Sequence, residues 1–156
     1  MSTAGKIIGI VHSGISVKSL DISIPFYRDI LGLELVKREP PKDSRAEKLG
    51  VPGARIQIAV FNVPNSDASL ELIEYLNPPS PNEYGAPVNA LGSVHIAFQV
   101  DDIGAIMERM IAAGVKFTCN EYEHITDGPL AGWKWIYFKD PDGTNMELIE
   151  VTEQFS

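Results

Sequence analysis

Leu70-Glu-Leu-Ile-Glu-Tyr75 in the first half of the chain returns as Met146-Glu-Leu-Ile-Glu-Val151 in the second half. Two other stretches, His12-Ser-Gly-Ile-Ser-Val17 and His95-Ile-Ala-Phe-Gln-Val100, each open with a histidine. The step from that histidine to the first glutamate of the repeat is 59 residues in one half and 52 in the other. Self-similarity at a nearly fixed spacing indicates that two copies of one module make up the chain.

Local signals divide each module into a strand, a helix and three further strands. Alternating, β-branched residues predict a strand over 9–17, and Ser19 or Asp21 can cap the helix that Gly32 ends. The second half repeats this plan with Asp101 or Asp102 as the cap and Gly114 as the end. The remaining strands are predicted at 34–37, 55–61 and 69–75, and at 116–118, 133–139 and 145–151. The predicted fold is therefore α+β, with two repeated βαβββ modules.

The length of 156 residues suits one domain, 1–156. We predict module 1 over about 7–76, a Pro-rich linker over 77–92 and module 2 over about 93–152. A net charge of −8 without a basic block argues against a nucleic-acid partner. No apolar run is long enough to span a membrane and no signal peptide is recognisable, so we expect a cytoplasmic protein. A single cysteine, Cys119, excludes an intrachain disulfide.

Four polar residues stand at matching strand positions in the two modules. Residues two apart in a strand share a face, so each of the four lies opposite the apolar face that a helix would cover. Convergent histidines and carboxylates need a counter-charge, which a divalent cation supplies. We therefore predict one metal site, built from His12, Glu71, His95 and Glu147. Two imidazoles and two carboxylates without a thiolate suit Zn²⁺, Ni²⁺, Co²⁺, Fe²⁺ or Mn²⁺.

The second glutamates of the repeat, Glu74 and Glu150, serve as an internal control. They share the composition of the predicted ligands but point to the other face. We expect them to be exposed or ion-paired.

These motifs resemble the vicinal oxygen chelate superfamily, which includes glyoxalase I, epimerases, extradiol dioxygenases and bleomycin-resistance proteins. The resemblance rests on His12 to Val17, on Phe26-Tyr-Arg-Asp-Ile-Leu-Gly-Leu33, on Val94 to Phe98, on Phe138-Lys-Asp-Pro-Asp-Gly143 and on the two repeats. It implies that the two modules curl their sheets into an open, cupped barrel around the metal. It also implies a metal chelated by two neighbouring oxygens of a small substrate, and a homodimer. The His, Glu, His, Glu quartet is similar to that of glyoxalase I and the epimerases.

The expected chemistry is that of a metal-dependent lyase or isomerase, in which the metal stabilises an enolate or enediolate. Glu147 is the first candidate for the base and Glu71 the second. Alternation within the strands gives the candidate substrate-binding residues as Arg55, Gln57, Tyr75, Trp133, Trp135 and Tyr137. Two alternatives stay open, namely an Fe²⁺ extradiol-type dioxygenase and a non-catalytic protein that binds a small drug or toxin.

Overall fold

The structure, a computed structural model, describes residues 4–43 and 46–151. The predicted end of module 2, residue 152, lies outside the described residues. The described chain divides into a first unit of residues 4–24 and 32–79 and a second unit of residues 25–31 and 80–151. Residues 25–31, which fall within predicted module 1, group with the second unit.

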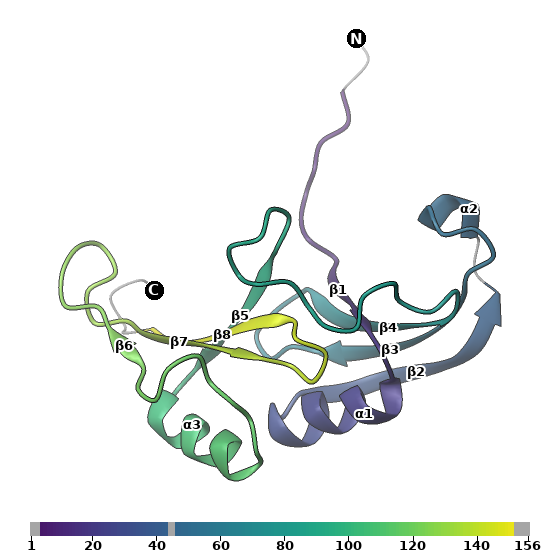
Figure 1. Cartoon of the computed structure of the whole chain (residues 1–156). Coiled ribbons are helices and arrows are strands. Elements are labelled where there is room, and N and C mark those ends of the chain that lie inside the picture. The colour runs from purple at the N-terminus through teal and green to yellow at the C-terminus, as the bar shows by residue number, and fades with distance from the viewer. Residues whose placement is uncertain (1–3, 44–45, 152–156) are drawn as a thin grey trace. The chain divides into compact units, whose positions relative to one another are not determined.

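The first unit is a four-stranded mixed sheet with one helix on one of its faces (Figure 1). Strand β1 runs parallel to β4, and the pairs β4–β3 and β3–β2 are antiparallel, in the order β1-β4-β3-β2. Its elements are β1 (His12–Val17), α1 (Leu20–Pro25), β2 (Glu34–Asp43), α2 (Ala46–Leu49), β3 (Arg55–Asn62) and β4 (Ser69–Asn77). A π-helical turn, η1 (Phe26–Ile30), continues from α1.

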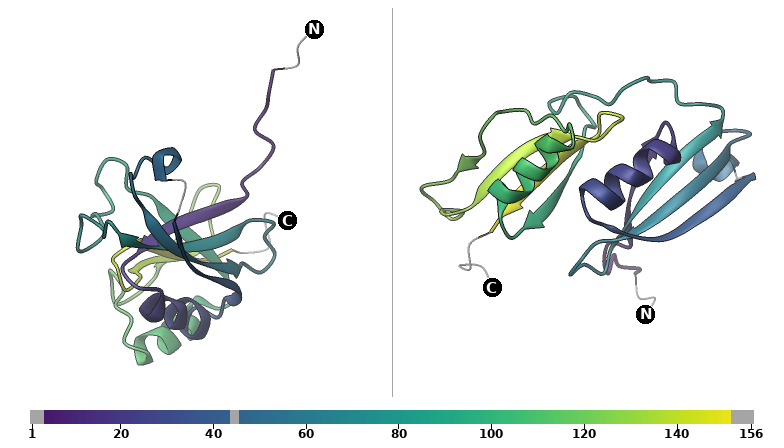
Figure 2. Two further views of the ribbon diagram at one scale, coloured as in Figure 1. Left: turned by 90° about the vertical axis from the view of Figure 1, so that its right-hand side faces the viewer. Right: turned by 90° about the horizontal axis from the view of Figure 1, so that it is seen from below.

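The second unit repeats this topology. Strand β5 is parallel to β8, and the order β5-β8-β7-β6 matches that of the first unit. Its elements are β5 (His95–Val100), α3 (Ile103–Ala112), β6 (Glu123–His124), β7 (Lys134–Lys139) and β8 (Asn145–Glu150). Helix α3 lies across one face of this sheet, as α1 does in the first unit (Figure 2). The predicted pair of βαβββ modules is confirmed, and each sheet is open.

The helix-covered face of each sheet forms the core. Leu20 and Ile24 of α1 are buried, as are Ile103 and Met110 of α3. The strand residues beneath them are Ile15, Val17, Ala59, Phe61, Leu70 and Leu72 in the first unit, and Ile136, Phe138, Met146 and Leu148 in the second. Each of these side chains other than that of Ala59 contributes about 1.5–3 kcal/mol through its removal from water. The other face of each sheet is therefore the one left for binding.

The repeated second glutamates bind the first backbone N–H of each helix. Glu74 accepts a hydrogen bond of 2.7 Å from the N–H of Leu20, and Glu150 accepts one of 2.9 Å from the N–H of Ile103. Carboxylates are favourable there because the first N–H groups of a helix have no partner within it. Glu150 is also ion-paired with Lys134, as expected. For Glu74 the expectation of an exposed or ion-paired side chain is wrong, since this half-buried residue caps a helix.

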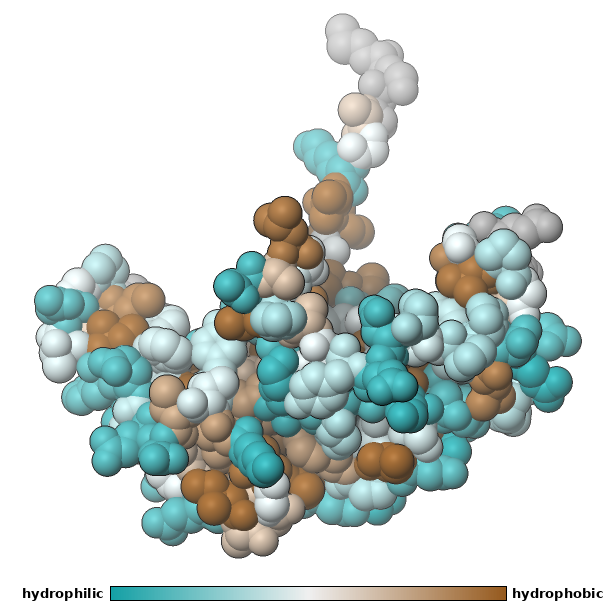
Figure 3. Space-filling model, viewed as in Figure 1, coloured by the Kyte–Doolittle hydropathy of each residue, from teal (hydrophilic) through white to brown (hydrophobic). Residues whose placement is uncertain are grey.

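Three strand predictions need correction. The strand predicted over 34–37 continues to Asp43 as β2. The first strand begins at His12 and not at Gly9, because Ile10 and Val11 precede the sheet and stay exposed. Figure 3 shows brown, apolar residues among teal and white ones in the segment that leads into β1. The range 116–118 is not a strand, since it makes only the isolated bridge between Phe117 and Phe138. The short β6 is instead the fourth strand of this sheet.

Part of the predicted linker packs onto the turn between β7 and β8. The N–H of Gly85 donates to the carbonyl of Asp142 at 2.8 Å, and a Cβ on Gly85 would lie 2.3 Å from the carbonyl oxygen of Gly143. Only glycine fits such a close approach. Lys139 adds hydrogen bonds to the carbonyls of Ala86 and Gly143, so this stretch is anchored to the second unit.

Candidate functional site

The open face of the first unit carries one of the two predicted ligand pairs. Parallel pairing aligns Gly14 of β1 with Glu71 of β4, which brings His12 diagonally next to that glutamate. The Nε2 atom of His12 lies 3.7 Å from Oε2 of Glu71. The side chains are 47% and 25% exposed, so both remain open to a ligand.

The second unit repeats the arrangement at tighter range. Ala97 of β5 is aligned with Glu147 of β8, and Nε2 of His95 lies 3.1 Å from Oε2 of Glu147. The side chain of Glu147 is only 11% exposed, whereas that of His95 is 43% exposed. The deeper burial of this carboxylate is the main difference between the two pairs.

Tyr137 completes the second pair. It lies directly opposite Glu147 in the antiparallel β7–β8 ladder, and its hydroxyl is 3.2 Å from Nε2 of His95. The rings of His95 and Tyr137 meet edge-on at 5.1 Å, and Trp135 packs at 5.7 Å on the other side of Tyr137. The result is an aromatic wall beside the buried carboxylate.

The environment of this pair shifts two pKa values. Burial raises the pKa of Glu147 above its ordinary value, while the nearby His95 and the Tyr137 hydroxyl act in the opposite direction. Burial also raises the pKa of Tyr137, and the negative charge of Glu147 adds to that shift. A carboxylate with a raised pKa is a better proton acceptor, which is what a general base requires.

The predicted substrate-binding residues divide into two groups. Tyr75, Trp135 and Tyr137 lie on the open faces. Tyr75 shares its face of β4 with Glu71, and Trp135 and Tyr137 pair with Ile149 and Glu147. Trp133 precedes β7 and is outside the ladder.

For Gln57 the argument from alternation is wrong. Gln57 shares its face of β3 with the buried residues Ala59 and Phe61. It pairs with Glu74 on the helix-covered face, where its amide donates to that carboxylate at 2.6 Å. Arg55 is exposed at the start of the strand.

The donor atoms of both pairs fit a divalent metal. Two donors about 2.1 Å from one ion and at right angles to each other lie about 3 Å apart. The separation in the second unit matches this value, and the one in the first unit needs only a small side-chain rotation. Within each unit, the described residues contain no group of three or more ligand side chains. Each unit alone thus offers two ligands.

Register reveals residues that reasoning from sequence missed. Val60 lies opposite Glu71 in the first unit, at the position that Tyr137 holds opposite Glu147 in the second. Gln57 and Lys134 are likewise equivalent, since each pairs with a helix-capping glutamate. These correspondences follow from the cross-strand register, which cannot be read from the sequence.

Two open βαβββ units, each with a histidine and a carboxylate on its open face, define a class of paired-module α+β proteins. A family model for the Glyoxalase/Bleomycin resistance protein/Dioxygenase superfamily matches residues 9–148. The chain belongs to this superfamily.

Known proteins similar to this chain include enzymes. A 2-epi-5-epi-valiolone epimerase from Actinomyces sp is 32% identical, over 92% of this chain and 80% of that protein. A lactoylglutathione lyase from Haemophilus influenzae is 30% identical, over 90% and 91% of the two chains. Among solved structures, a glyoxalase-family protein from Bacillus cereus aligns with a TM-score of 0.80 and 25% identity, over 97% and 99% of the two chains.

Proposed function

We propose that this protein is a metal-dependent isomerase or lyase that removes a proton from a carbon beside a carbonyl group. In this proposal His12, Glu71, His95 and Glu147 together bind one divalent ion, Zn²⁺, Ni²⁺, Co²⁺, Fe²⁺ or Mn²⁺. The observation that carries it is the duplication of a histidine–glutamate pair at equivalent register positions, with donor atoms 3.7 and 3.1 Å apart. Each pair supplies half of a four-ligand set.

A bound divalent ion would act as a Lewis acid that stabilises negative charge on two neighbouring oxygens of the substrate. Glu147 takes the proton from the adjacent carbon and returns it, either to the other face of that carbon or to its neighbour. Its burial and raised pKa suit this role better than the more exposed position of Glu71. Glu71 is then chiefly a ligand.

The residues around the second pair suit a small ring-bearing or apolar substrate. Trp135 and Tyr137 present aromatic surface next to Glu147, and Ile149 extends that surface along β8. Tyr75 lies on the open face of the first unit, opposite Ile56. Aromatic rings bind the C–H faces of cyclic substrates without requiring a charge.

The names of the relatives favour this reaction class. An epimerase inverts one carbon centre, which requires that a proton leave and return. The epimerase and the lactoylglutathione lyase act on different molecules, so the similarity supports the chemistry and leaves the substrate open.

The test uses protein stripped of metal and reloaded with each of the five ions in turn. With 2-epi-5-epi-valiolone in D₂O, we expect proton NMR to show deuterium entering the carbon beside the carbonyl, only in a metal-loaded sample. The formation of lactoylglutathione from glutathione and methylglyoxal is measured in parallel.

Exchange or turnover that persists in fully stripped protein would refute the metal dependence. Oxygen uptake on catechol with Fe²⁺, together with no exchange on either substrate, would instead establish the dioxygenase reaction.

A further inference from the structure

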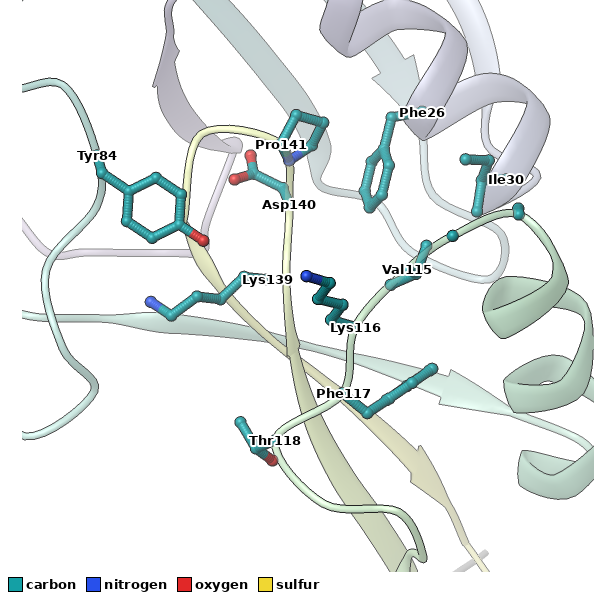
Figure 4. A pocket seen from close by; sticks show the side chains of 12 residues that line it. Phe26, Ile30, Tyr84, Val115, Lys116, Phe117, Thr118, Lys139, Asp140 and Pro141 are labelled. Atoms are coloured by element: carbon teal, nitrogen blue, oxygen red, sulfur yellow. The ribbon is translucent and has the colours of Figure 1, made fainter.

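A hollow lies in the second unit, and its lining includes none of the four predicted ligands. It has a volume of about 400 Å³, is open to solvent, and is lined by η1, by the chain after α3 and by the end of β7 (Figure 4). Cavities of this size hold small organic ligands. The proposed reaction makes no use of it.

One side of this hollow is aromatic and apolar. Phe26 is buried at the base of η1, and Phe117 packs against Phe138 with 5.7 Å between ring centroids. Pro141 lies next to Phe26 on this side, whereas Tyr84 lies beyond Lys139 (Figure 4). Burial of the two faces of such a ring is the expected source of affinity.

The other side carries uncompensated positive charge. Lys116 reaches across the hollow toward the strand that holds Lys139 (Figure 4) and has no ion-pair partner among residues 4–43 and 46–151. The ammonium of Lys139 is bound by neutral oxygens of Ala86, Gly143 and Asn145, which leave its charge in place.

The lining contains one carboxylate, that of Asp140, and it is already hydrogen-bonded within the protein. It accepts hydrogen bonds from the Tyr27 hydroxyl and from the N–H groups of Asp142 and Thr144. The hollow therefore carries net positive charge in a chain whose overall charge is −8.

The backbone N–H groups at the rim indicate which kind of anion the hollow can bind. The N–H groups of Gly114, Val115 and Thr118 donate to the carbonyls of Ile111, Met110 and Tyr137. None of these three is left to bind a phosphate, which requires several donors at once. The ammonium of Lys116 therefore suits a monovalent carboxylate better than a phosphate.

We propose that this hollow binds a small aromatic carboxylic acid, with its ring between Phe26 and Phe117 and its carboxylate on Lys116. The ligand would contact Phe117 and Thr118, the segment that binds the carbonyl of Tyr137 through both the N–H and the hydroxyl of Thr118. No covalent step is involved.

The test is a titration of the full chain with 1-naphthoate, followed by amide NMR and calorimetry. We expect saturable binding with a dissociation constant of about 1 mM or below. Amide shifts should concentrate in residues 113–118 and in Lys139 and Asp140. The neutral analogue 1-naphthalenemethanol should bind about tenfold more weakly, because it lacks the charge that pairs with Lys116.

Two variants with the same change in charge provide the matched comparison. Lys116→Met should weaken naphthoate binding about tenfold, and Lys48→Met, which removes a lysine from the first unit, should leave it unchanged. Several results would overturn the proposal: no saturation, equal loss in both variants, equal binding of the neutral analogue, or tighter binding of inorganic phosphate than of naphthoate.

Discussion

The two units place a histidine and a glutamate at the same positions of the same fold, yet surround them differently. Opposite Glu71 stands Val60, while opposite Glu147 stands Tyr137. One register step along, Ile58 faces Ile73 in the first unit, whereas Trp135 takes the equivalent place in the second. The histidine–glutamate pair is thus the same in both units, whereas the residues of the surrounding strands differ. The second unit acquired the burial and the aromatic hydroxyl that suit acid–base chemistry.

The helix caps show the opposite behaviour. Glu74 and Glu150 accept the first N–H of their helices at 2.7 and 2.9 Å, although a glutamine supports one and a lysine the other. Differences between the units therefore concentrate on the open faces, while the helix-covered faces stay alike.

The largest expected effect separates the two glutamates of the site. Glu147→Gln should lower kcat by about 10³-fold, because the amide cannot take a proton. Glu71→Gln should lower it only about tenfold, because an amide oxygen still serves as a ligand. Steady-state kinetics and deuterium exchange of the metal-loaded variants measure the difference. Equal losses, or the reverse order, would show that the functional asymmetry between the units is wrong.

Two substitutions compare the 84–86 segment, which packs on the β7–β8 turn, with the β3–β4 turn of the first unit. Gly85→Ala should destabilise the protein by about 2 kcal/mol or more, because its Cβ would collide with the Gly143 carbonyl. In the first unit, Asn65 adopts a left-handed conformation with φ of 56°. Asn65→Ala should cost about 1 kcal/mol or less. Urea unfolding followed by circular dichroism tests both. A Gly85→Ala protein as stable as wild type would show that the 84–86 segment is not held against the turn.

The capping glutamates provide a third comparison. Glu150→Gln should cost about 1–2 kcal/mol at pH 7, because it removes the ion pair with Lys134 and weakens the bond to Ile103. Glu74→Gln should cost about 1 kcal/mol, since only hydrogen bonds are affected.

The cost of Glu150→Gln should depend on pH. The N–H of Ile103 and the ammonium of Lys134 hold the pKa of Glu150 below its usual value. A lowered folded-state pKa gives stability above the unfolded-state pKa of about 4.3, and this is lost as pH falls through the folded value. Unfolding titrations should therefore show the difference between wild type and variant shrinking at acid pH. A constant difference would contradict the assigned interactions.

The smallest expected effect concerns the hydroxyl beside the second pair. Tyr137→Phe should lower kcat about fivefold, because Glu147 loses a hydrogen-bonding neighbour. The reciprocal change, Val60→Tyr, should leave kcat within about twofold, since Glu71 does not carry the proton in this account. A larger effect of Val60→Tyr than of Tyr137→Phe would place the chemistry in the first unit.

Much of the fold could be predicted because the repeat appears directly in the sequence. Gly32 and Gly114 end their helices with φ of 81° and 86°, and Asp102 caps α3 through the N–H of Ala105, as expected. These signals are local, so a linear sequence contains them. The described residues contain no helix long and apolar enough to span a membrane.

The errors arose where non-local pairing decides the structure. Residues 116–118 look like a strand, but they pair with β7 only through the isolated bridge of Phe117 with Phe138, while β6 pairs with the other end of β7. Gln57 lies on the helix-covered face with Ala59 and Phe61, where its amide binds Glu74, a partner from the neighbouring strand. The metal, the homodimer and the cytoplasmic location stay predictions.

The most direct test is the metal stoichiometry of the chain and of two single-ligand variants, His12→Ala and His95→Ala. Elemental analysis after reloading and dialysis should find one ion per wild-type chain and a loss of most of it in either variant, because both pairs hold the same ion. Two ions per chain, or full retention of one ion after loss of either histidine, would show that the pairs do not share a site and would contradict the account.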